Sequence, residues 1–430
     1  MQASAEKEEK PKPKISPPKI ALSLVLFTIF MDMAAIGIII PLYPKLMEEI
    51  SHTNLSSSSI YSGWMQFSYS FVQFLCLPLL GVFSDRYGRR PLILLAILGL
   101  SLDFFMTAWA PNLFWLFLSR ILAGMMGASV SIASAYIADI SSPKNLAQNF
   151  GLMGAMTGMG FVVGPAIGGL LGAWGLRFPF YFAGGVSLLN FSLCLFFLPE
   201  SLPKEKRKEG TKKQLNPFLP LVVFLKKPEM LFFGTIHFLT SMGDQVFFSV
   251  WTFFSMARFG WDEKAVGIAL SYFGFLVFLF QGFLVKPISK KFSVSKIIIW
   301  GLSIEIFCFI CTGFVTQGWL TYLINALVEV GAIFHVVFLT FISSKIPSNE
   351  QGELQGNMNA IFSLTSILGP ILMTSVFYLS TQSPEKFYQP GAPFFCSALF
   401  YLAALVLVRR YFQKNGRLWA STSSSSIADG

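Results

Sequence analysis

Long apolar segments recur along almost the whole of this chain. The segment 20–42 is long enough, at about 1.5 Å per residue, to cross a hydrocarbon core of about 30 Å as a helix. Backbone groups in lipid must form their hydrogen bonds within the segment, and helices achieve this. The composition agrees, because 54% of the 430 residues are hydrophobic and only 13% are charged. The sequence therefore predicts an all-α polytopic membrane protein.

Twelve such segments fall into two groups of six. We place the transmembrane helices at 20–42, 59–83, 91–110, 112–138, 147–172, 179–199, 229–256, 264–286, 295–315, 317–344, 352–380 and 390–412. A basic, proline-containing stretch that begins at residue 200 separates the two groups. We expect an N-terminal six-helix half at 20–199, a solvated cytoplasmic linker at 200–228 and a C-terminal half at 229–412. The polar ends, 1–19 and 413–430, are predicted to be disordered cytoplasmic tails without a signal peptide.

The distribution of Lys and Arg predicts the orientation. If the amino terminus is inside, the outer connections contain only five of the 32 basic residues, namely Lys45, Arg177, Arg258, Lys264 and Lys386. Arg120 lies within a helix, and all the others lie on the inner side. Both termini are therefore expected to be cytoplasmic. The net charge of +10 reflects this bias, and no basic patch with interleaved aromatic residues indicates a nucleic-acid partner.

All five cysteines fall inside predicted helices: Cys76, Cys194, Cys308, Cys311 and Cys396. Cys308 and Cys311 form a CxxC pair, but no second pair or nearby His completes a metal site. We interpret all five as apolar packing residues and predict no metal site. An intramembrane enzyme is disfavoured, because prenyl or acyl transfer needs an acidic metal-binding pair or an activated His, and neither Asp-x-x-x-Asp nor a His-rich motif is present.

Four charged residues lie within predicted helices at about one depth: Asp32, Asp103, Arg120 and Glu305. Each is about 8–12 residues from a helix end, which places all four near the bilayer midplane. A charge there costs about 2.5–3.5 kcal/mol on insertion scales, so we expect the four to line one polar cavity. The alternative is that Arg120 and one carboxylate form an ion pair that only holds helices together. One arginine cannot neutralise three carboxylates, so at least one is expected to be protonated for part of a cycle.

The turn "GVFSDRYGRRP", residues 81–91, concentrates charge between the second and third helices. If the turn had no role beyond the excess of basic residues on the inner side, Arg86 and Arg90 would be explained, but Asp85 and the two glycines would not. Asp139 ends the fourth helix on the same side, so we expect Arg89 to bridge to it and to latch the inner face in one of two states. The predicted gating residues are Gly81, Asp85, Arg86, Gly88, Arg89, Arg90 and Asp139.

Glycines recur every four residues along the fifth helix. Gly160, Gly164, Gly168 and Gly172 form one smooth stripe that lets another helix approach closely, and Pro165 bends the helix between them. The stripe lies in the predicted outer half. It is expected either to seal the external path or to serve packing alone.

Two of these patterns carry a family resemblance. The sequence Gly81-x-x-x-Asp85-Arg86-x-Gly88-Arg89-Arg90 resembles the cytoplasmic signature between helices 2 and 3 of the major facilitator superfamily. The fifth helix resembles the motif of that superfamily's drug/proton antiporters through Gly151, Gly160, Gly164, Pro165, Gly168 and Gly169. Arg120 in "SRILAGMMGA" is similar to the intramembrane arginine motif. In this order, on these helices, the motifs imply the twelve-helix major facilitator fold.

The resemblance narrows to the tetracycline-efflux proteins, through Asp32 with Gly37 in helix 1, "SLDFF" around Asp103, "LPES" at 198–201 and "QGELQG" at 351–356. Gln73 and Gln281 match glutamines of that group, and Gln245 is similar; each can donate to a polyoxygenated ligand or bridge two helices. There are two departures. Glu305 stands where the group typically has an aspartate, and Val277 stands where some members have a histidine.

The resemblance implies an exporter in a bacterial inner membrane that exchanges a tetracycline-type drug, with or without a chelated divalent cation, for protons. It implies no bound cofactor, protons as the coupling ion, lipid and a small molecule as partners, and no obligate protein partner. The alternatives are a proton-coupled transporter of another amphipathic compound or metabolite, and a transporter-like receptor.

Overall fold

The structure, a computed structural model, describes residues 19–207, 216–218, 228–347, 350–383 and 388–415. Its first part is helical from α1 to α7, in the order α1 (Lys19–Ser51), α2 (Leu55–Tyr87), α3 (Arg89–Trp109), α4 (Leu113–Met126), α5 (Ser129–Ile140), α6 (Leu146–Gly172) and α7 (Phe178–Phe197). A short 3-10 helix, η1 (Lys204–Lys206), follows. The predicted tails and most of the predicted linker lie outside the described residues, so the predicted domain boundaries there stay predictions.

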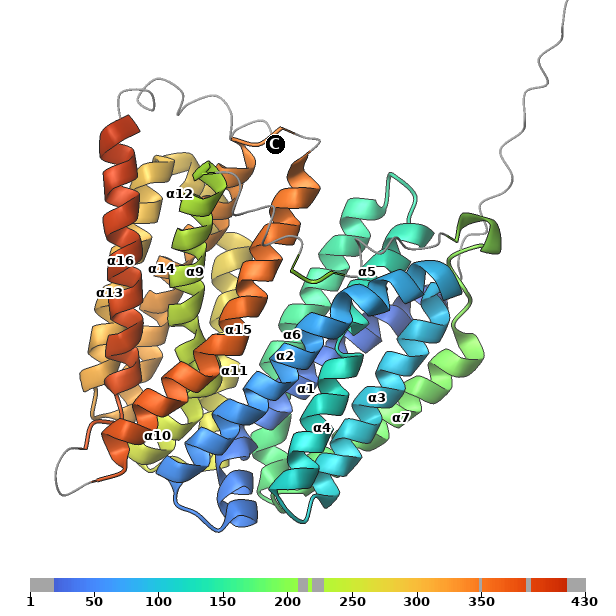
Figure 1. Ribbon diagram of the computed structural model, residues 1–430, viewed down its shortest axis with the longest axis horizontal. Coiled ribbons are helices and arrows are strands. Elements are labelled where there is room, and N and C mark those ends of the chain that lie inside the picture. The colour runs from blue at the N-terminus through green and yellow to red at the C-terminus, as the bar shows by residue number, and fades with distance from the viewer. Residues whose placement is uncertain (1–18, 208–215, 219–227, 348–349, 384–387, 416–430) are drawn as a thin grey trace, which may run out of the picture.

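The second part is also helical. It contains α9 (Pro228–Ser249), α10 (Trp251–Phe259), α11 (Glu263–Phe283), α12 (Val285–Lys291), α13 (Val294–Phe314), α14 (Gly318–Ser343), α15 (Gln351–Thr381) and α16 (Ala392–Asn415). Figure 1 shows α1–α7 and α9–α16 as two bundles that stand side by side. We call them the N-terminal and C-terminal bundles. The all-α fold with two halves is as predicted.

The count of twelve membrane-spanning helices is not confirmed. Within the described residues, eleven helices are long and apolar enough to cross a membrane. The seventh predicted span, 229–256, is interrupted at Val250 between α9 and α10. His237, Asp244 and Gln245 lower the hydropathy of α9, and for that reason this span is not among the eleven.

Two other helices depart from the predicted spans. The predicted helix 112–138 is broken at Gly127 and Ala128, so it forms α4 and α5. The first helix continues to Ser51 and includes both Pro41 and Pro44, whereas the sequence predicts an end at residue 42. A proline inside a transmembrane helix is tolerated because neighbouring groups satisfy the freed backbone carbonyl.

Each bundle has its own apolar core. In the C-terminal bundle the core is aromatic, with Phe254, Phe309, Phe334, Phe394 and Tyr401 all fully buried. In the N-terminal bundle two smaller clusters pack around Ile29 and Leu42 of α1. The five cysteines are unpaired, and Cys194 and Cys308 are buried among these apolar side chains, as the sequence predicts.

Among the described residues, the two bundles contact each other from one end to about the middle of their helices, where Gly274 of α11 lies against Phe161 of α6. We call the end that bears residues 198–207 the linker end, at the top of Figure 1, and the opposite end the far end. At the far end Lys45 of α1 forms an ion pair with Glu263 of α11, with 2.8 Å between Nζ and Oε1. Nearby, the Ser56 hydroxyl donates to the Thr381 hydroxyl at 2.8 Å and joins α2 to α15. Toward the linker end, the two bundles separate (Figure 1).

Candidate substrate and proton site

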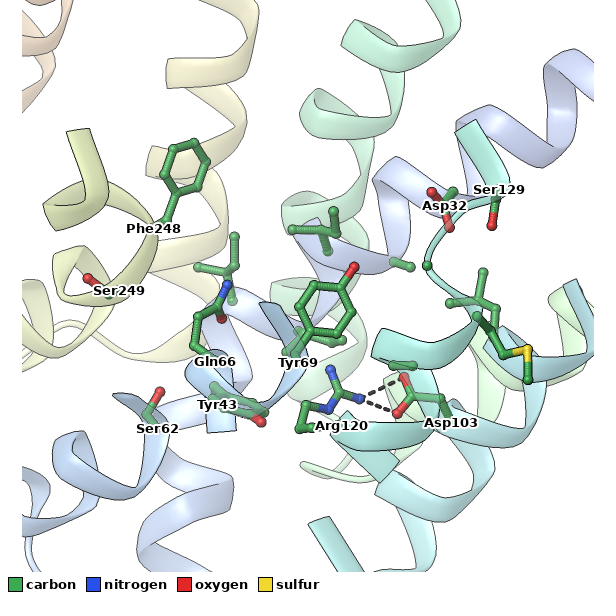
Figure 2. A pocket seen from close by; sticks show the side chains of 18 of the residues that line it. Asp32, Tyr43, Ser62, Gln66, Tyr69, Asp103, Arg120, Ser129, Phe248 and Ser249 are labelled. Atoms are coloured by element: carbon green, nitrogen blue, oxygen red, sulfur yellow. Dashed lines mark hydrogen bonds and ion pairs between the residues drawn. The ribbon is translucent and has the colours of Figure 1, made fainter. Parts of the chain in front are cut away.

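A cavity of about 130 Å³ lies between the bundles. Figure 2 shows it from close by, with Asp32, Asp103 and Arg120 on one side and Phe248 and Ser249 on the other. We call it the polar cavity. Its other polar lining residues are Tyr43, Ser62, Gln66, Tyr69, Ser129 and Thr252. Both bundles therefore contribute to one polar site.

Arg120 and Asp103 form a buried ion pair in this cavity. Nη2 of Arg120 lies 2.5 Å and 2.7 Å from the two carboxylate oxygens of Asp103, and it donates to the Thr107 hydroxyl at 3.1 Å. Only 8% of Arg120 and 1% of Asp103 is exposed. The break between α4 and α5 follows Arg120 by two turns, while α3 supplies Asp103 and Thr107. Arg120 thus pairs with one carboxylate, as in the alternative raised from the sequence, and the two charges compensate each other.

Asp32 faces the same cavity without a basic partner among the described residues. It lies on α1 beside Ser129 at the start of α5, as Figure 2 shows. Its side chain is half-buried. Since Asp103 and Arg120 neutralise each other, Asp32 is the charge of the polar cavity that a cationic group or a proton can compensate.

A larger apolar chamber adjoins the polar cavity. Its volume is about 620 Å³, and Ile40 and Phe248 line both spaces. The chamber lies between α1, α6, α9, α11 and α14, and its apolar wall includes Phe161, Phe247, Trp251, Phe273 and Phe278. Gln281, Asn325 and Thr157 are its polar contributors, and Val277 lies beside them. The two spaces together offer a charged part and an aromatic part.

The prediction that all four intramembrane charges share one cavity is wrong for Glu305. This residue is 3% exposed and lies on α13, which packs against α14 and α16 rather than against the other bundle. Its Cγ packs against Gly331 of α14. Depth along a helix axis does not determine which face of a bundle a residue occupies, and the position of α13 within its bundle places Glu305 away from the polar cavity.

The three predicted glutamines have different surroundings. Gln73 donates to the Gly127 carbonyl at 2.8 Å and to the Tyr69 hydroxyl at 3.1 Å, so it joins α2 to the break after α4. Gln245 is buried and donates to the Ser366 hydroxyl at 3.4 Å. Gln281 lines the apolar chamber. Only Gln281 is therefore placed to contact a ligand in one of the two spaces.

The Arg89–Asp139 bridge of the predicted latch is formed at the linker end, although the two bundles are apart there. Arg89 lies 2.5 Å from Asp85 (Nη1 to Oδ1) and 3.2 Å from Asp139 (Nε to Oδ2), and it donates to the Ser84 hydroxyl at 3.0 Å. Gly88 connects α2 to α3 with a φ of +110°, in the region that favours glycine. The cluster joins α2, α3 and α5 within the N-terminal bundle.

The other residues of this turn differ in their roles. Arg86 lies over the ring of Tyr87, 5.5 Å from its centroid, and Arg90 donates to the Leu195 carbonyl at 2.7 Å. A Cβ added at Gly81 would meet no atom within 4 Å, so packing in this conformation does not explain that glycine.

Glu200 is a part of the latch that the sequence reasoning did not assign. Its carboxylate accepts from the backbone N–H of Arg89 at 2.8 Å and of Arg90 at 3.3 Å, and it lies 3.9 Å from Arg207. It therefore caps the start of α3, where a negative charge is favourable. In the sequence, Glu200 belongs to "LPES" at 198–201, which indicates a family resemblance but not this contact.

The glycine stripe of α6 packs as predicted. Gly160, Gly164 and Gly168 lie against the α1 backbone, at Phe30, Ala34 and Ile38. Pro165 packs against Gly37 of α1, and Gly169 faces Gly267 of α11. Gly151 differs, because it lines the apolar chamber and has no neighbour within 4 Å of an added Cβ.

Comparison with known proteins identifies the family. A model of the Major Facilitator Superfamily matches residues 25–255 and 233–424. The chain belongs to the major facilitator superfamily. The class C tetracycline resistance protein of Escherichia coli is 35% identical over 393 residues, covering 91% of this chain and 96% of that protein. Quinolone resistance protein NorA of Staphylococcus aureus is 29% identical, with 84% and 91% covered.

The solved structures agree on the fold of this major facilitator protein. The crystal structure of the nucleoside transporter NupG matches with a TM-score of 0.75 at 14% identity, and it covers 91% of this chain and 99% of that chain. At this identity the likeness shows the fold alone. The chain is thus a multi-pass membrane protein of a transporter family, as predicted.

Two groups of residues in this transporter were missed by sequence reasoning. Tyr43, Gln66 and Tyr69 line the polar cavity, but a polar residue within an apolar helix gives no sign of the face it occupies. Asp244 and His335 stand together in the C-terminal bundle, with 3.6 Å between Oδ2 and Nε2. From the sequence alone, His335 is interpreted as a satisfied core histidine.

Proposed function

We propose that this chain exports amphipathic, ring-containing drugs of the tetracycline class in exchange for protons, by alternating access across a bacterial inner membrane. The observation that carries the proposal is the polar cavity between the bundles, with Asp32 and the buried pair of Asp103 and Arg120. Identity of 35% to a tetracycline resistance protein over nearly the whole chain supports the drug class.

The two adjoining spaces suit an amphipathic substrate. Asp32 and the hydroxyls around it can compensate a cationic group or a divalent cation carried by the drug. The apolar chamber of about 620 Å³ can hold a ring system, and this volume lies within the range of about 300–1,000 Å³ for drug-sized sites. Proton entry then competes with the drug for the same carboxylates, so that binding of one favours release of the other.

Glycines along two helix pairs support alternating access. At the far end, α2 packs against α15 at Gly63, and α6 packs against α11 at Gly169 and Gly267. Toward the linker end the same four helices carry glycines that have no neighbour within 4 Å of an added Cβ: Gly81, Gly151, Gly154, Gly282, Gly352 and Gly356. We interpret these open glycines as the surfaces that pack when the linker end closes and the far end opens.

The second candidate is an exporter of another amphipathic drug through the same machinery. Val277 lines the apolar chamber, at the position where some tetracycline-efflux proteins have a histidine. An apolar side chain there favours a ligand with less hydrogen-bonding capacity on that side. The similarity to the quinolone resistance protein NorA points in the same direction.

The test is drug accumulation in sensitive bacterial cells that express this chain. We expect reduced accumulation of a tetracycline, and restored accumulation when an uncoupler dissipates the proton gradient. The control is the Asp103→Asn variant, inserted to the same level, which should not export. Lower accumulation of quinolones alone would favour the second candidate, and unchanged accumulation across the whole drug panel would refute both.

The open glycines allow a matched test of alternating access. Gly81→Leu should fold normally, because the site has space and leucine favours helix, but it should block closure of the linker end and abolish export. Gly185→Leu on α7 is the control, since Gly185 also has no neighbour within 4 Å of an added Cβ, and α7 belongs to neither helix pair. Equal export by the two variants would contradict the closing surface.

A further inference from the structure

Titratable side chains gather inside the C-terminal bundle, apart from both spaces described above. Four helices contribute them: α9 supplies Asp244, α13 supplies Glu305, α14 supplies Glu329 and His335, and α16 supplies Tyr401. We call these five residues the C-terminal cluster. None of them lines the polar cavity or the apolar chamber.

One side of the C-terminal cluster is a hydrogen-bonded trio. The Tyr401 hydroxyl donates to Asp244 and lies 3.3 Å from Nε2 of His335, which in turn is 3.6 Å from Oδ2 of Asp244. Tyr401 is fully buried, but the side chain of Asp244 is 28% exposed and that of His335 is 33% exposed. Asp244 and His335 are therefore the open side of the cluster.

The other side consists of two buried carboxyl groups. Glu305 and Glu329 are 3% and 2% exposed. Oε2 of Glu329 has no hydrogen-bond partner, and no ion pair involves either glutamate among the described residues. Both groups are close enough to Asp244 for its charge to act on them, and they also act on each other. Three acids thus share one region of low dielectric constant.

The cluster contains no lysine or arginine. In the described part of this bundle such residues lie near helix ends, as Arg258, Lys345 and Arg409 do. The other titratable groups that face the cluster are His237 on α9, near His335, and Cys308 on α13, near Glu305. Leaving an ionised carboxylate unpaired in a protein interior costs several kcal/mol. The negative charge of these acids must therefore be neutralised by a bound cation, and a proton is the smallest such cation.

We propose that the C-terminal cluster is a second proton-binding site, separate from the polar cavity. Glu329 and Glu305 are the carboxyls that hold the proton, and Asp244 and His335 are the groups that exchange it with solvent. A proton added to a glutamate carboxylate forms a neutral carboxyl, which removes the unpaired charge from the bundle interior. Its use in drug export rests on the proposed function, but proton binding itself does not.

Tyr401 connects the two partly exposed side chains, Asp244 and His335. When His335 is an imidazolium, Nε2 can give its proton to the phenol oxygen while the phenol gives its own proton to Asp244. The histidine becomes neutral, the aspartate becomes a carboxylic acid, and the tyrosine returns to its first state. No electrons move, and no further reactant is needed. The described residues offer no group of three or more His, Cys, Asp or Glu placed to hold a metal ion.

The test is an infrared pH titration of the purified full-length protein in lipid nanodiscs, without drug. Protonated carboxyls have a carbonyl stretch band distinct from that of carboxylates. We expect Glu329→Gln and Glu305→Gln each to remove part of the pH-dependent band. Asp32→Asn, at the unpaired carboxyl of the polar cavity, should remove a different part, so that the double variant of Asp32→Asn and Glu329→Gln loses both. Glu205→Gln, in the exposed segment η1, should leave the buried band unchanged.

A second variant keeps the proposal testable if a glutamate variant unfolds. Tyr401→Phe preserves the ring and removes the hydroxyl, and it should change the proton affinity read from the band by about tenfold, through loss of a hydrogen bond to a charged group. An unchanged titration in Tyr401→Phe and in Glu329→Gln would overturn the proposal. So would loss of the band in the parent protein when sodium or potassium is added, since the cluster would then bind an alkali cation.

The outcome is separable from that of the proposed function. If no drug is exported but the glutamate variants lose their part of the band, the second proton site stands and the export proposal fails. If a drug is exported and only Asp32→Asn alters the band, the export proposal stands and the second site fails.

Discussion

The two bundles of this transporter compensate their charges in different ways. In the membrane interior of the N-terminal bundle, Arg120 is within 2.7 Å of both carboxylate oxygens of Asp103. In the C-terminal bundle, Glu305 and Glu329 are equally buried, and no basic side chain pairs with them among the described residues. Two halves of one fold thus carry a fixed ion pair and a set of unpaired acids.

The linker end repeats this difference. The N-terminal bundle holds Arg89 between Asp85 and Asp139. At the corresponding place in the C-terminal bundle, α12 carries Lys286, Lys290 and Lys291, and no ion pair is formed by these lysines in the described residues. The comparison indicates that the N-terminal bundle pairs most of its interior charges with arginines, Asp32 excepted, whereas the charge of the C-terminal bundle depends on the protons it binds.

Arg120→Ala should have the largest effect on stability. It leaves Asp103 buried without a partner, and removing one member of a buried pair typically costs about 3–5 kcal/mol. We expect a fall of this size in the free energy of unfolding, together with complete loss of export. Thermal unfolding of the purified protein and drug accumulation in cells measure the two effects.

The double variant of Asp103→Asn and Arg120→Gln is the control for that change. It removes both charges, so it should regain most of the lost stability without regaining export. If Arg120→Ala alone unfolds no more readily than the parent, the pair is not a fixed structural element, and the contrast between the bundles disappears.

The charged pair of the N-terminal bundle was largely predictable, and the C-terminal cluster was not. The apolar period places Asp103 and Arg120 at one depth, and adjacent antiparallel helices bring such residues together. Depth alone, however, leaves open which face of a bundle a residue occupies, and for this reason Glu305 was placed in the wrong cavity. Glu200 was missed for a related reason, because its partners at 89 and 90 are more than 100 residues away in the chain. The break between α9 and α10 at Val250 was also missed, because no proline or glycine marks it in the sequence.

Glu305→Gln should abolish export at little cost to stability. Glutamine keeps the size of the side chain beside Gly331, and it removes a carboxyl that has no basic partner, so we expect the free energy of unfolding to stay within about 1 kcal/mol of the parent value. Glu305→Asp should retain export with an altered drug preference. Drug accumulation and thermal unfolding, measured on both variants, test these two expectations.

This second prediction sharpens the comparison because its expected effect on stability is much smaller than that of Arg120→Ala. A loss of several kcal/mol in Glu305→Gln would mean that Glu305 is held by a strong ionic contact, as Asp103 is. Export by the glutamine variant at the parent rate would mean that the remaining acids carry the coupling.

Arg89→Ala should have the smallest effect on stability. The Arg89 side chain is 13% exposed and Asp85 is 49% exposed, so water screens the pair, and a contact of this kind contributes about 1 kcal/mol or less. Two conformations that differ by only a few kcal/mol are still shifted appreciably by such a change. We therefore expect slower pH-driven transport in proteoliposomes, with drug binding at the polar cavity largely unchanged.

Lys290→Ala is the matched control, because it removes a basic residue at the corresponding place in the C-terminal bundle, where no ion pair is formed in the described residues. It should leave transport at the parent rate. A cysteine introduced in place of Arg89 and modified to restore a positive charge should recover part of the lost rate, since the effect is assigned to the charge between Asp85 and Asp139 and not to the guanidinium shape. Loss of drug binding together with transport in Arg89→Ala would show that the turn supports the fold. Equal slowing by Lys290→Ala would show that any basic residue at the linker end acts alike, and that the latch does not distinguish the two bundles.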